Sequence, residues 1–339
     1  MKYWYLFPVA ALMAYILTLM LRQYALSRSI IDIPNARSSH SIPTPRGGGV
    51  AIVVTFLLAI PLLGFFEYIS WAWVWSLVPA GAIVAIVGFL DDHGHIAARW
   101  RLLGHFTSAI IALLFLRGLA PLNIYGYVVD FGIFGFVLAA FYLVWLLNLY
   151  NFMDGIDGLA SVEAITACLG MCLIYWYVGK VDLIWPALVL ALAVSGFLFW
   201  NFPPAKIFMG DAGSGFLGIA LGILSLQSAW IESQFFWSWL IVLGVFICDA
   251  TFTLLRRLMR GDKVYEAHRS HGYQYASRQF GKHLPVTLAV LCINVFWLLP
   301  IAYFVAVQQI SGLTGVFIAY IPLVLLAIKF KSGALEHSD

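Results

Sequence analysis

Charged side chains are scarce in this sequence of 339 residues. Asp, Glu, Lys and Arg make up 10% of it, whereas 63% of the residues are apolar and the mean hydropathy is +0.93. A soluble domain usually carries about 25% charged and about 45–50% apolar residues, so the scarcity of charge excludes a water-soluble globule. The net charge is only +3. We expect a lipid bilayer, and no nucleic acid, as the surroundings of this chain.

Cysteine is also rare, and no CxxC or Cys/His pattern is present. The four cysteines all lie within apolar runs: Cys168, Cys172, Cys248 and Cys292. We interpret them as core residues and not as redox centres or zinc ligands.

Long apolar runs, in contrast, are abundant. A helix needs about 20 apolar residues to cross about 30 Å of hydrocarbon. The first run ends at Arg22 without a small-residue cleavage site, so we expect a retained transmembrane helix there and not a signal peptide. We predict eleven spans, at residues 3–22, 48–66, 71–90, 103–120, 131–149, 160–179, 183–200, 213–230, 235–255, 285–306 and 310–328. They leave no soluble domain, and we expect one all-α polytopic integral membrane domain over residues 1–339.

The basic residues indicate the orientation of this predicted bundle. Cytoplasmic loops collect Lys and Arg. When the loops are assigned alternately to two sides, only Lys2, Arg117 and Lys180 fall on the N-terminal side. We therefore predict a periplasmic N-terminus and a cytoplasmic C-terminus. The polar motifs fall on the cytoplasmic side, where we expect an active site formed by residues 22–47, 91–102, 150–159, 201–212 and 256–284.

Two adjacent acids, Asp91 and Asp92, end the third predicted span. Neighbouring carboxylates at a membrane boundary repel each other unless cations offset their charge. A magnesium-bound substrate or the nearby Arg99 and Arg101 could supply that charge. A solvated helix cap is the alternative reading of the same pair.

Amides and acids recur at intervals of three after the fifth predicted span, at Asn148, Asn151, Asp154 and Asp157. Residues three apart are neighbours on a helix, so these oxygens follow one stripe. Hard oxygen ligands suit Mg²⁺, which keeps several waters and binds substrate phosphates. The alternative is a polar turn between two spans, broken by glycine.

A third motif, NFPPAKIFMGDAGSG, surrounds the acid Asp211. Its prolines end a helix, and its glycines allow backbone to approach a ligand closely. A helix that begins near Ala212 would point free N–H groups at an anion, to which Lys206 could add charge. A helix start capped by Asp211 is the alternative.

Asp249 lies within the ninth predicted span, seven residues before Arg256 and on nearly the same helix face. An acid inside a membrane helix favours a functional role by default. Pairing with Arg256 explains it equally well, and the sequence leaves both readings open.

Two cytoplasmic loops are basic. The last one carries His268, Arg269 and His271, which offer donors to phosphate or sugar oxygens. Metal ligation by the histidines and a plain positive-inside loop are the alternatives. The first loop carries Arg46 within a Pro and Gly framework and could bind a lipid phosphate or only connect two spans.

Five motifs in this order, DIPNARSSH with PTPRGGG, GFLDD, NxxNFMDGIDGLA, NFPPAKIFMGDAGS and RR…HRSHGYQ, cover nearly the whole chain. Together they resemble the polyprenyl-phosphate N-acetylhexosamine-1-phosphate transferase family, which includes the peptidoglycan translocase. The resemblance implies a bacterial inner-membrane enzyme that transfers a sugar-1-phosphate from a UDP-sugar to undecaprenyl phosphate. The reaction releases UMP and requires Mg²⁺, for which Mn²⁺ is an alternative. The resemblance also allows a homodimer.

The resemblance also implies roles for single residues. Asp211 corresponds to the principal metal ligand and Asn151 to its partner, while Asp91 and Asp92 correspond to the catalytic pair. The implied substrate-binding residues, which include a uracil pocket and a sugar and diphosphate element, are Asp154, Gly155, Ile156, Asp157, Asn201, Phe208, His268, Arg269 and His271.

One motif departs from the family. The peptidoglycan enzymes carry a run of close histidines where this chain has His268-Arg269-Ser270-His271. That form resembles the O-antigen subgroup, which implies UDP-N-acetylfucosamine or UDP-N-acetylquinovosamine as donors besides UDP-N-acetylglucosamine, in the initiation of O-antigen lipopolysaccharide. An ion- or proton-coupled transporter is the alternative function, and it would place its acids near the bilayer midplane.

Overall fold

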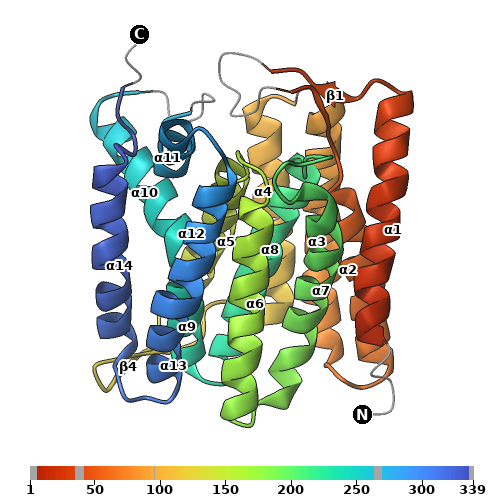
Figure 1. The fold of residues 1–339 in the computed structure, drawn as a ribbon. Coiled ribbons are helices and arrows are strands. Elements are labelled where there is room, and N and C mark those ends of the chain that lie inside the picture. Colours follow the sequence, from red (N-terminus) through yellow and green to blue (C-terminus); the bar gives the residue numbers. More distant parts are fainter. Residues whose placement is uncertain (1–5, 35–41, 95, 263–268, 336–339) are drawn as a thin grey trace.

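The computed structural model describes residues 6–34, 42–94, 96–262 and 269–335, which fold into a bundle of helices (Figure 1). The described residues of the two chain ends lie at opposite ends of the bundle. The helices are α1 (Leu6–Ser27), α2 (Val50–Phe65), α3 (Trp71–Gly94), α4 (Ala98–Leu116), α5 (Gly132–Met153), α6 (Leu159–Tyr177), α7 (Ile184–Asn201), α8 (Asp211–Ala229), α9 (Ser233–Val242), α10 (Gly244–Met259), α11 (Gly272–Phe280), α12 (Leu284–Ile293), α13 (Leu299–Ala306) and α14 (Gly312–Lys329).

Two short antiparallel hairpins complete the described structure, and the sequence analysis did not anticipate them. β1 (Ile31–Asp32) pairs with β2 (Thr44–Pro45), and β3 (Leu122–Ile124) pairs with β4 (Tyr127–Val129). The first hairpin matters for the site, because β2 leads directly into Arg46 and the glycines that follow it.

The predicted eleven spans exceed what the structure supports. In the described residues, nine helices are long and apolar enough to cross a membrane, and the bent pair of α9 and α10 makes a tenth if it is one span. The remaining predicted span, 48–66, contains α2, which has only 16 residues. At 1.5 Å per residue α2 is about 24 Å long, shorter than the roughly 30 Å hydrocarbon core. The chain is therefore an all-helical polytopic membrane protein with nine or ten candidate spans among these residues.

The span predicted at 235–255 is not one straight helix. The axes of α9 and α10 differ by 70° at a break between Val242 and Gly244. Gly244 lies tightly against α14, because an added Cβ there would meet Leu323 and Tyr320 side-chain carbons at 3.1 Å. The bend carries the polar half of α10, with Asp249, toward α11 and α14.

The span predicted at 285–306 is confirmed as the continuous stretch α12 to α13, joined by a π-helical turn at Asn294–Leu298. The Asn294 amide donates to the carboxylate of Glu163 at 2.6 Å and to the hydroxyl of Thr166 at 2.8 Å. These bonds fix the turn to α6 inside the bundle.

The centre of the bundle is α8, whose side chains are almost all buried. Its small residues let neighbouring helices come very close. An added Cβ on Gly213 would lie 2.6 Å from the Cα of Gly49, and one on Gly218 would lie 2.6 Å from the carbonyl oxygen of Leu146. This packing places the N-terminus of α8, and with it Asp211, at the end of the bundle where α2 begins and α3 and α5 end (Figure 1).

Candidate active site

The segment after β2 and the segment before α8 are joined by backbone hydrogen bonds. The amide of Gly48 donates to the carbonyl of Phe208 at 2.9 Å, and the amide of Gly49 donates to the carbonyl of Met209 at 2.8 Å. In return, the amide of Phe208 donates to the carbonyl oxygen of Pro45 at 2.8 Å. The pairing fixes the PRGGG motif beside the FMGD motif. Arg46 is consequently held next to the N-terminus of α8.

Arg46 bridges two acids that are far apart in the sequence. Its Nη2 lies 2.7 Å from Oδ1 of Asp92 and 2.9 Å from Oδ1 of Asp211. Burial opposes the charge of Arg46, but the carboxylates of Asp211 and Asp92 outweigh it and raise the pKa of the guanidinium. The sequence analysis named Arg46 only as part of a basic loop. Its position inside PTPRGGG, one of the motifs on which the resemblance rests, was the available signal.

Asp92 closes the N-terminus of α8 from a different helix. Its two carboxylate oxygens accept the amides of Asp211 at 3.0 Å and Ala212 at 3.3 Å. Such amides have no partner within their own helix and favour a negative charge. Gly210 has a φ of +80°, and an added Cβ there would lie 2.6 Å from Asp92 Oδ2. This glycine makes room for Asp92, whereas the sequence analysis expected it to make room for a ligand.

Asp91 has separate partners. Its Oδ2 lies 2.6 Å from Nη1 of Arg101, and its Oδ1 accepts the amide of Ile96 at 2.7 Å. Arg101 therefore offsets the charge of this acid, as the sequence analysis anticipated. The side chain of Asp91 also interacts with that of Asp211. Although they are adjacent in the chain, Asp91 and Asp92 are held in different ways.

A cavity of about 190 Å³ lies between α3, α4, α5 and the start of α8. Asp91, Asn151 and Asp211 line it, together with Asn148 and Arg101. The side chain of Asn151 interacts with Asp211, and its Nδ2 donates to the Ser214 hydroxyl at 3.0 Å. The structure thus brings together the proposed metal-ligand pair and one acid of the proposed catalytic pair.

The oxygens around this cavity suit a hard divalent cation. Within the described ranges, no group of three or more His, Cys, Asp or Glu side chains is placed to hold a metal by itself. Mg²⁺ does not need such a cage, because it takes one or two carboxylates and completes its shell with water and phosphate oxygens. The carboxylates of Asp211 and Asp91 and the amide oxygen of Asn151 fit that requirement.

Asp154 directly follows α5 and lies close to the same acids. Burial, and then the negative charge of Asp211, raise the pKa of Asp154 well above its usual range. The acids of the site therefore lie so close together that Asp154 favours its neutral form. A bound divalent cation would relieve this repulsion.

A second, larger cavity of about 400 Å³ contains Asp157 and Phe208 of the predicted uracil pocket. Lys282 and His283 also line it. The Asp157 carboxylate lies 3.1 Å from Nδ1 of His283 and accepts the amide of Ala205 at 3.0 Å. Neither His283 nor Lys282 was named among the site residues expected from the sequence. Their place before α12, at the end of the basic loop, was the only hint.

Gly155 and Ile156 are not among the residues that line this cavity. Ile156 is 5% exposed. An added Cβ on Gly155 would lie 2.1 Å from the hydroxyl oxygen of Tyr273, which itself donates to the carbonyl of Phe152 at 2.9 Å. The segment between Asp154 and Asp157 is therefore packed against α11.

Asn201 uses both ends of its amide within the chain. Its Oδ1 accepts the amide of Gly158 at 3.0 Å, and its Nδ2 donates to the carbonyl of Ile207 at 3.0 Å. Lys206, expected near an anion, has its ammonium 5.4 Å from the ring centre of Trp200. The structure assigns both side chains to the framework of the loop.

The last basic loop is described only in part. His268 lies outside the described residues, while Arg269 and His271 are placed just before α11. His271 is 2% exposed and caps α11 together with Gln274. Burial, assisted by the positive charge of Arg257, lowers the pKa of His271 to about 3, so the ring is neutral at physiological pH. Its ring stacks on that of Phe152, with 6.2 Å between the centres.

Known proteins are similar to this chain over most of its length. The profile of glycosyl transferase family 4 matches residues 74–229. A Bacillus subtilis protein named as a probable undecaprenyl-phosphate N-acetylglucosaminyl 1-phosphate transferase is 30% identical over 275 residues, which cover 78% of this chain and 74% of that protein. The decaprenyl-phosphate N-acetylglucosaminephosphotransferase of Mycolicibacterium smegmatis is 31% identical, and the match covers 77% of this chain and 73% of that protein. A phospho-N-acetylmuramoyl-pentapeptide-transferase of Streptococcus pneumoniae is 29% identical, and the match covers 71% of this chain and 77% of that protein.

These similarities support a transferase and not the alternative of an ion- or proton-coupled transporter. They extend over more than two thirds of each relative, and the matched region contains Asp91, Asn151 and Asp211. The chain belongs to glycosyl transferase family 4, the polyprenyl-phosphate N-acetylhexosamine-1-phosphate transferases, and is a membrane-embedded glycosyl-1-phosphate transferase.

Proposed function

We propose that this enzyme transfers an N-acetylated amino-sugar-1-phosphate from a UDP-sugar to undecaprenyl phosphate and releases UMP, at the cytoplasmic face of a bacterial inner membrane. The observation that carries the proposal is the convergence of Asp91, Asn151 and Asp211 on one cavity at the start of α8, with Arg46 beside them. The bias of Lys and Arg toward that end of the bundle supports its cytoplasmic location.

Asp211 and Asn151 are the residues that would hold Mg²⁺, or Mn²⁺ in its place. When bound, the ion neutralises charge on the diphosphate and orients it for displacement. The chain adds the guanidinium of Arg46, whose planar fork suits phosphate oxygens. The lipid phosphate oxygen forms a bond to the β-phosphorus of the donor. The bond between that phosphorus and the bridging oxygen breaks, and the oxygen leaves with UMP.

The two adjacent acids take different parts in this proposal. Asp91 lines the cavity and orients the lipid phosphate. That phosphate has a second pKa of about 6, so it is already mostly dianionic at neutral pH and hardly needs a general base. Asp92 is buried against Arg46 and the start of α8, and it positions Asp211 instead of touching substrate.

The larger cavity receives the nucleotide. Its volume of about 400 Å³ suits a small organic ligand, and Phe208 offers a ring on which uracil stacks. Phe208 and Asp211 are three residues apart in the same segment, so a base on Phe208 directs its diphosphate toward the acidic cavity. Asp157 lines this cavity, and Lys282 supplies positive charge at its edge. Asp154, Gly155, Ile156 and Asn201 do not line it but belong to the segments next to the residues that do, and Asn201 holds the backbone of Gly158 and Ile207.

The sugar is recognised by the last basic loop, through His268 and Arg269, while the buried His271 holds the start of α11 behind them. The HRSH form of this loop supports UDP-N-acetylfucosamine and UDP-N-acetylquinovosamine as donors and the initiation of O-antigen lipopolysaccharide as the biological role. The names of the Bacillus and Mycolicibacterium relatives support N-acetylglucosamine as a third donor sugar.

Purified protein supplied with Mg²⁺, undecaprenyl phosphate and each of the three donors in turn tests this proposal. We expect UMP release that requires both the lipid and the metal, and the ranking of the donors then identifies the sugar. Folded protein that released no UMP from any donor would contradict the proposed substrates.

A further inference from the structure

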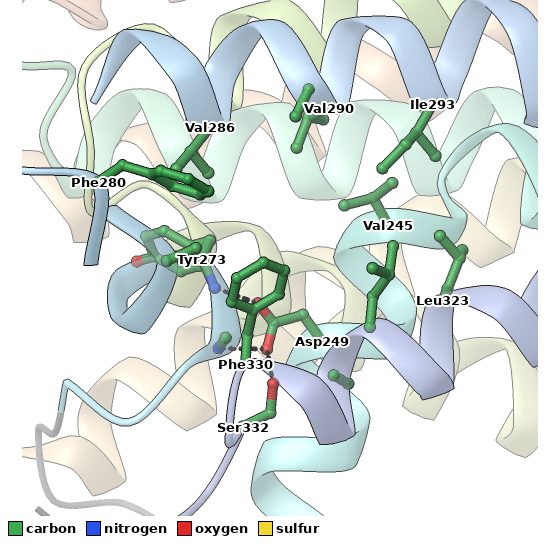
Figure 2. A pocket seen from close by; sticks show the side chains of 15 residues that line it. Val245, Asp249, Tyr273, Phe280, Val286, Val290, Ile293, Leu323, Phe330 and Ser332 are labelled. Carbon is green, nitrogen blue, oxygen red and sulfur yellow. Dashed lines mark hydrogen bonds between the residues drawn. The ribbon is translucent and has the colours of Figure 1, made fainter. Parts of the chain in front are cut away.

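Asp249 is a buried carboxylate in otherwise apolar surroundings. It lines a pocket of about 110 Å³ between α10, α11, α12 and α14, where its neighbours include Val245, Val290 and Leu323 (Figure 2). A carboxylate in such a place is costly unless its charge is compensated. Asp249 takes no part in the proposed reaction, so the groups that compensate its charge point to another role.

Backbone amides compensate Asp249. The amides of Gly272 and Tyr273, the first two residues of α11, donate to Oδ1 at 2.8 Å and Oδ2 at 2.9 Å (Figure 2). Amides at a helix start have no partner within the helix and carry partial positive charge. Asp249 therefore caps α11 from another helix. His271 lies 3.9 Å away but is neutral, so the contact is not an ion pair.

Two hydroxyls also donate to Asp249, that of Thr253 on α10 at 3.3 Å and one from the far end of the sequence. The Ser332 hydroxyl donates to Asp249 Oδ1 at 3.0 Å (Figure 2). Arg256, which the sequence analysis considered as a partner of Asp249, donates instead to the carbonyl of Ser332 at 3.1 Å. We call residues 331–333 the C-terminal strap. Its Gly333 amide donates to the carbonyl of Ser270, and its Gly333 carbonyl accepts Arg260 at 2.8 Å.

The contacts continue from α11 to the acidic cavity. Tyr273, whose amide donates to Asp249, also donates its hydroxyl to the carbonyl of Phe152. Phe152 lies near the end of α5, one residue after Asn151. The same hydroxyl fills the space beside Gly155. An added Cβ on Gly272 would lie 2.4 Å from the Ser332 hydroxyl, so the strap and α11 fit closely. A continuous set of contacts thus joins Ser332 and Asp249 to the loop that carries Asp154.

We propose that Asp249 and Ser332 are positioning residues that clamp α11, with Arg269 and His271 at its start, against the end of α5 and thereby fix the donor-binding geometry. The clamp is a property of this fold, whereas its effect on the donor rests on the proposed function. Loss of the clamp leaves the metal-binding and lipid-binding side chains in place and displaces the residues assigned to the sugar and diphosphate.

Ser332→Ala is the direct test, with Ser238→Ala as its matched control. Ser238 is an equally buried serine whose hydroxyl bridges two helices, at 3.0 Å from the carbonyls of Gln234 and Ala302, far from the strap in the chain. A hydrogen bond to a charged group contributes enough to shift an equilibrium by about tenfold. We expect Ser332→Ala to raise the KM for the donor by about that factor with the lipid KM unchanged. Ser238→Ala leaves both values as in the wild type.

Amide hydrogen exchange supplies a readout that needs no turnover. In Ser332→Ala and in Asp249→Asn, peptides that contain Gly272 and Tyr273 should exchange faster than in the wild type, and those from α9 should not. Unchanged exchange in both variants would overturn the clamp, and faster exchange with an unaltered donor KM would overturn its role in donor binding. If wild-type protein used no UDP-sugar, the proposed function would fail on its own, and exchange alone would decide whether the clamp exists.

Discussion

The guanidinium of Arg46 lies 2.9 Å from the carboxylate of Asp211, the acid that we assign to the metal. The same Nη2 atom lies 2.7 Å from Asp92. A built-in cation therefore already neutralises the acids at the start of α8. Because Arg46 is held by the backbone pairing of its loop with residues 208–209, this charge is a fixed part of the site.

Arg46→Ala should expose the repulsion between Asp92 and Asp211. The Arg46 side chain is 34% exposed, so solvent screens part of the effect, and we expect a loss of about 1–3 kcal/mol in stability without metal. Added Mg²⁺ should then raise the thermal midpoint more in the variant than in the wild type. Arg22→Ala is the control, because Arg22 donates to the Lys206 carbonyl and not to an acid. An equal response to Mg²⁺ in all three proteins would contradict the account.

Asp211→Asn should abolish turnover while the protein still folds and inserts. The amide keeps the size of the side chain and removes the charge that a divalent cation requires. We expect UMP release to fall by about a hundredfold or more, with a far-UV circular dichroism spectrum like that of the wild type. Normal activity in a well-folded variant would remove the metal assignment.

Arg269→Ala should weaken use of the donor more than use of the lipid. Arg269 lies at the start of the segment that we assign to the sugar and diphosphate, so its loss should raise the donor KM by about tenfold. Lys329→Ala, which removes an exposed cation at the end of α14, serves as the control. A normal donor KM with an altered lipid KM would reverse the assigned role.

His271 should make the fold sensitive to acid. Its pKa is about 3 in the folded protein, against about 6.5 in an unfolded chain. Between these values the unfolded state binds more protons, so stability is lost as pH falls below about 6.5. His271→Asn keeps a capping acceptor and removes the titrating group. The thermal midpoint of this variant should fall less between pH 7 and pH 5, whereas the exposed control His93→Asn should follow the wild type. Equal slopes in all three proteins would refute this assignment.

The sequence predicted the membrane-embedded helical class and the loops that carry the site, because both depend on local composition. Apolar runs and their polar ends are visible without any tertiary information. The break between α9 and α10 was not predictable, since no proline marks it and both halves are apolar enough to be read as one span. The short length of α2 was missed for a similar reason, because Gly48 and Gly49 before it and Phe66 after it add no charge that would mark its ends.

Partners within the site depended on long-range packing and were harder to predict. Arg46 reaches Asp211 across 165 positions of the chain, and Asp249 meets Ser332 across 83. Apart from its place in the PTPRGGG motif, no local pattern distinguishes Arg46 from the other basic residues in its loop. The motif resemblance indicated that these segments belong together, and the structure shows how backbone pairing and glycine contacts bring them into register.

The most direct test of the central claim follows the donor's two phosphates separately. Wild-type protein receives Mg²⁺, undecaprenyl phosphate and the preferred UDP-sugar with radioactive phosphorus in either the α or the β phosphate. We predict that the β label enters the lipid and the α label leaves as UMP, because the bond between the β-phosphorus and the bridging oxygen is broken. Release of both labels together as UDP would show transfer of the sugar without its phosphate and would contradict the account.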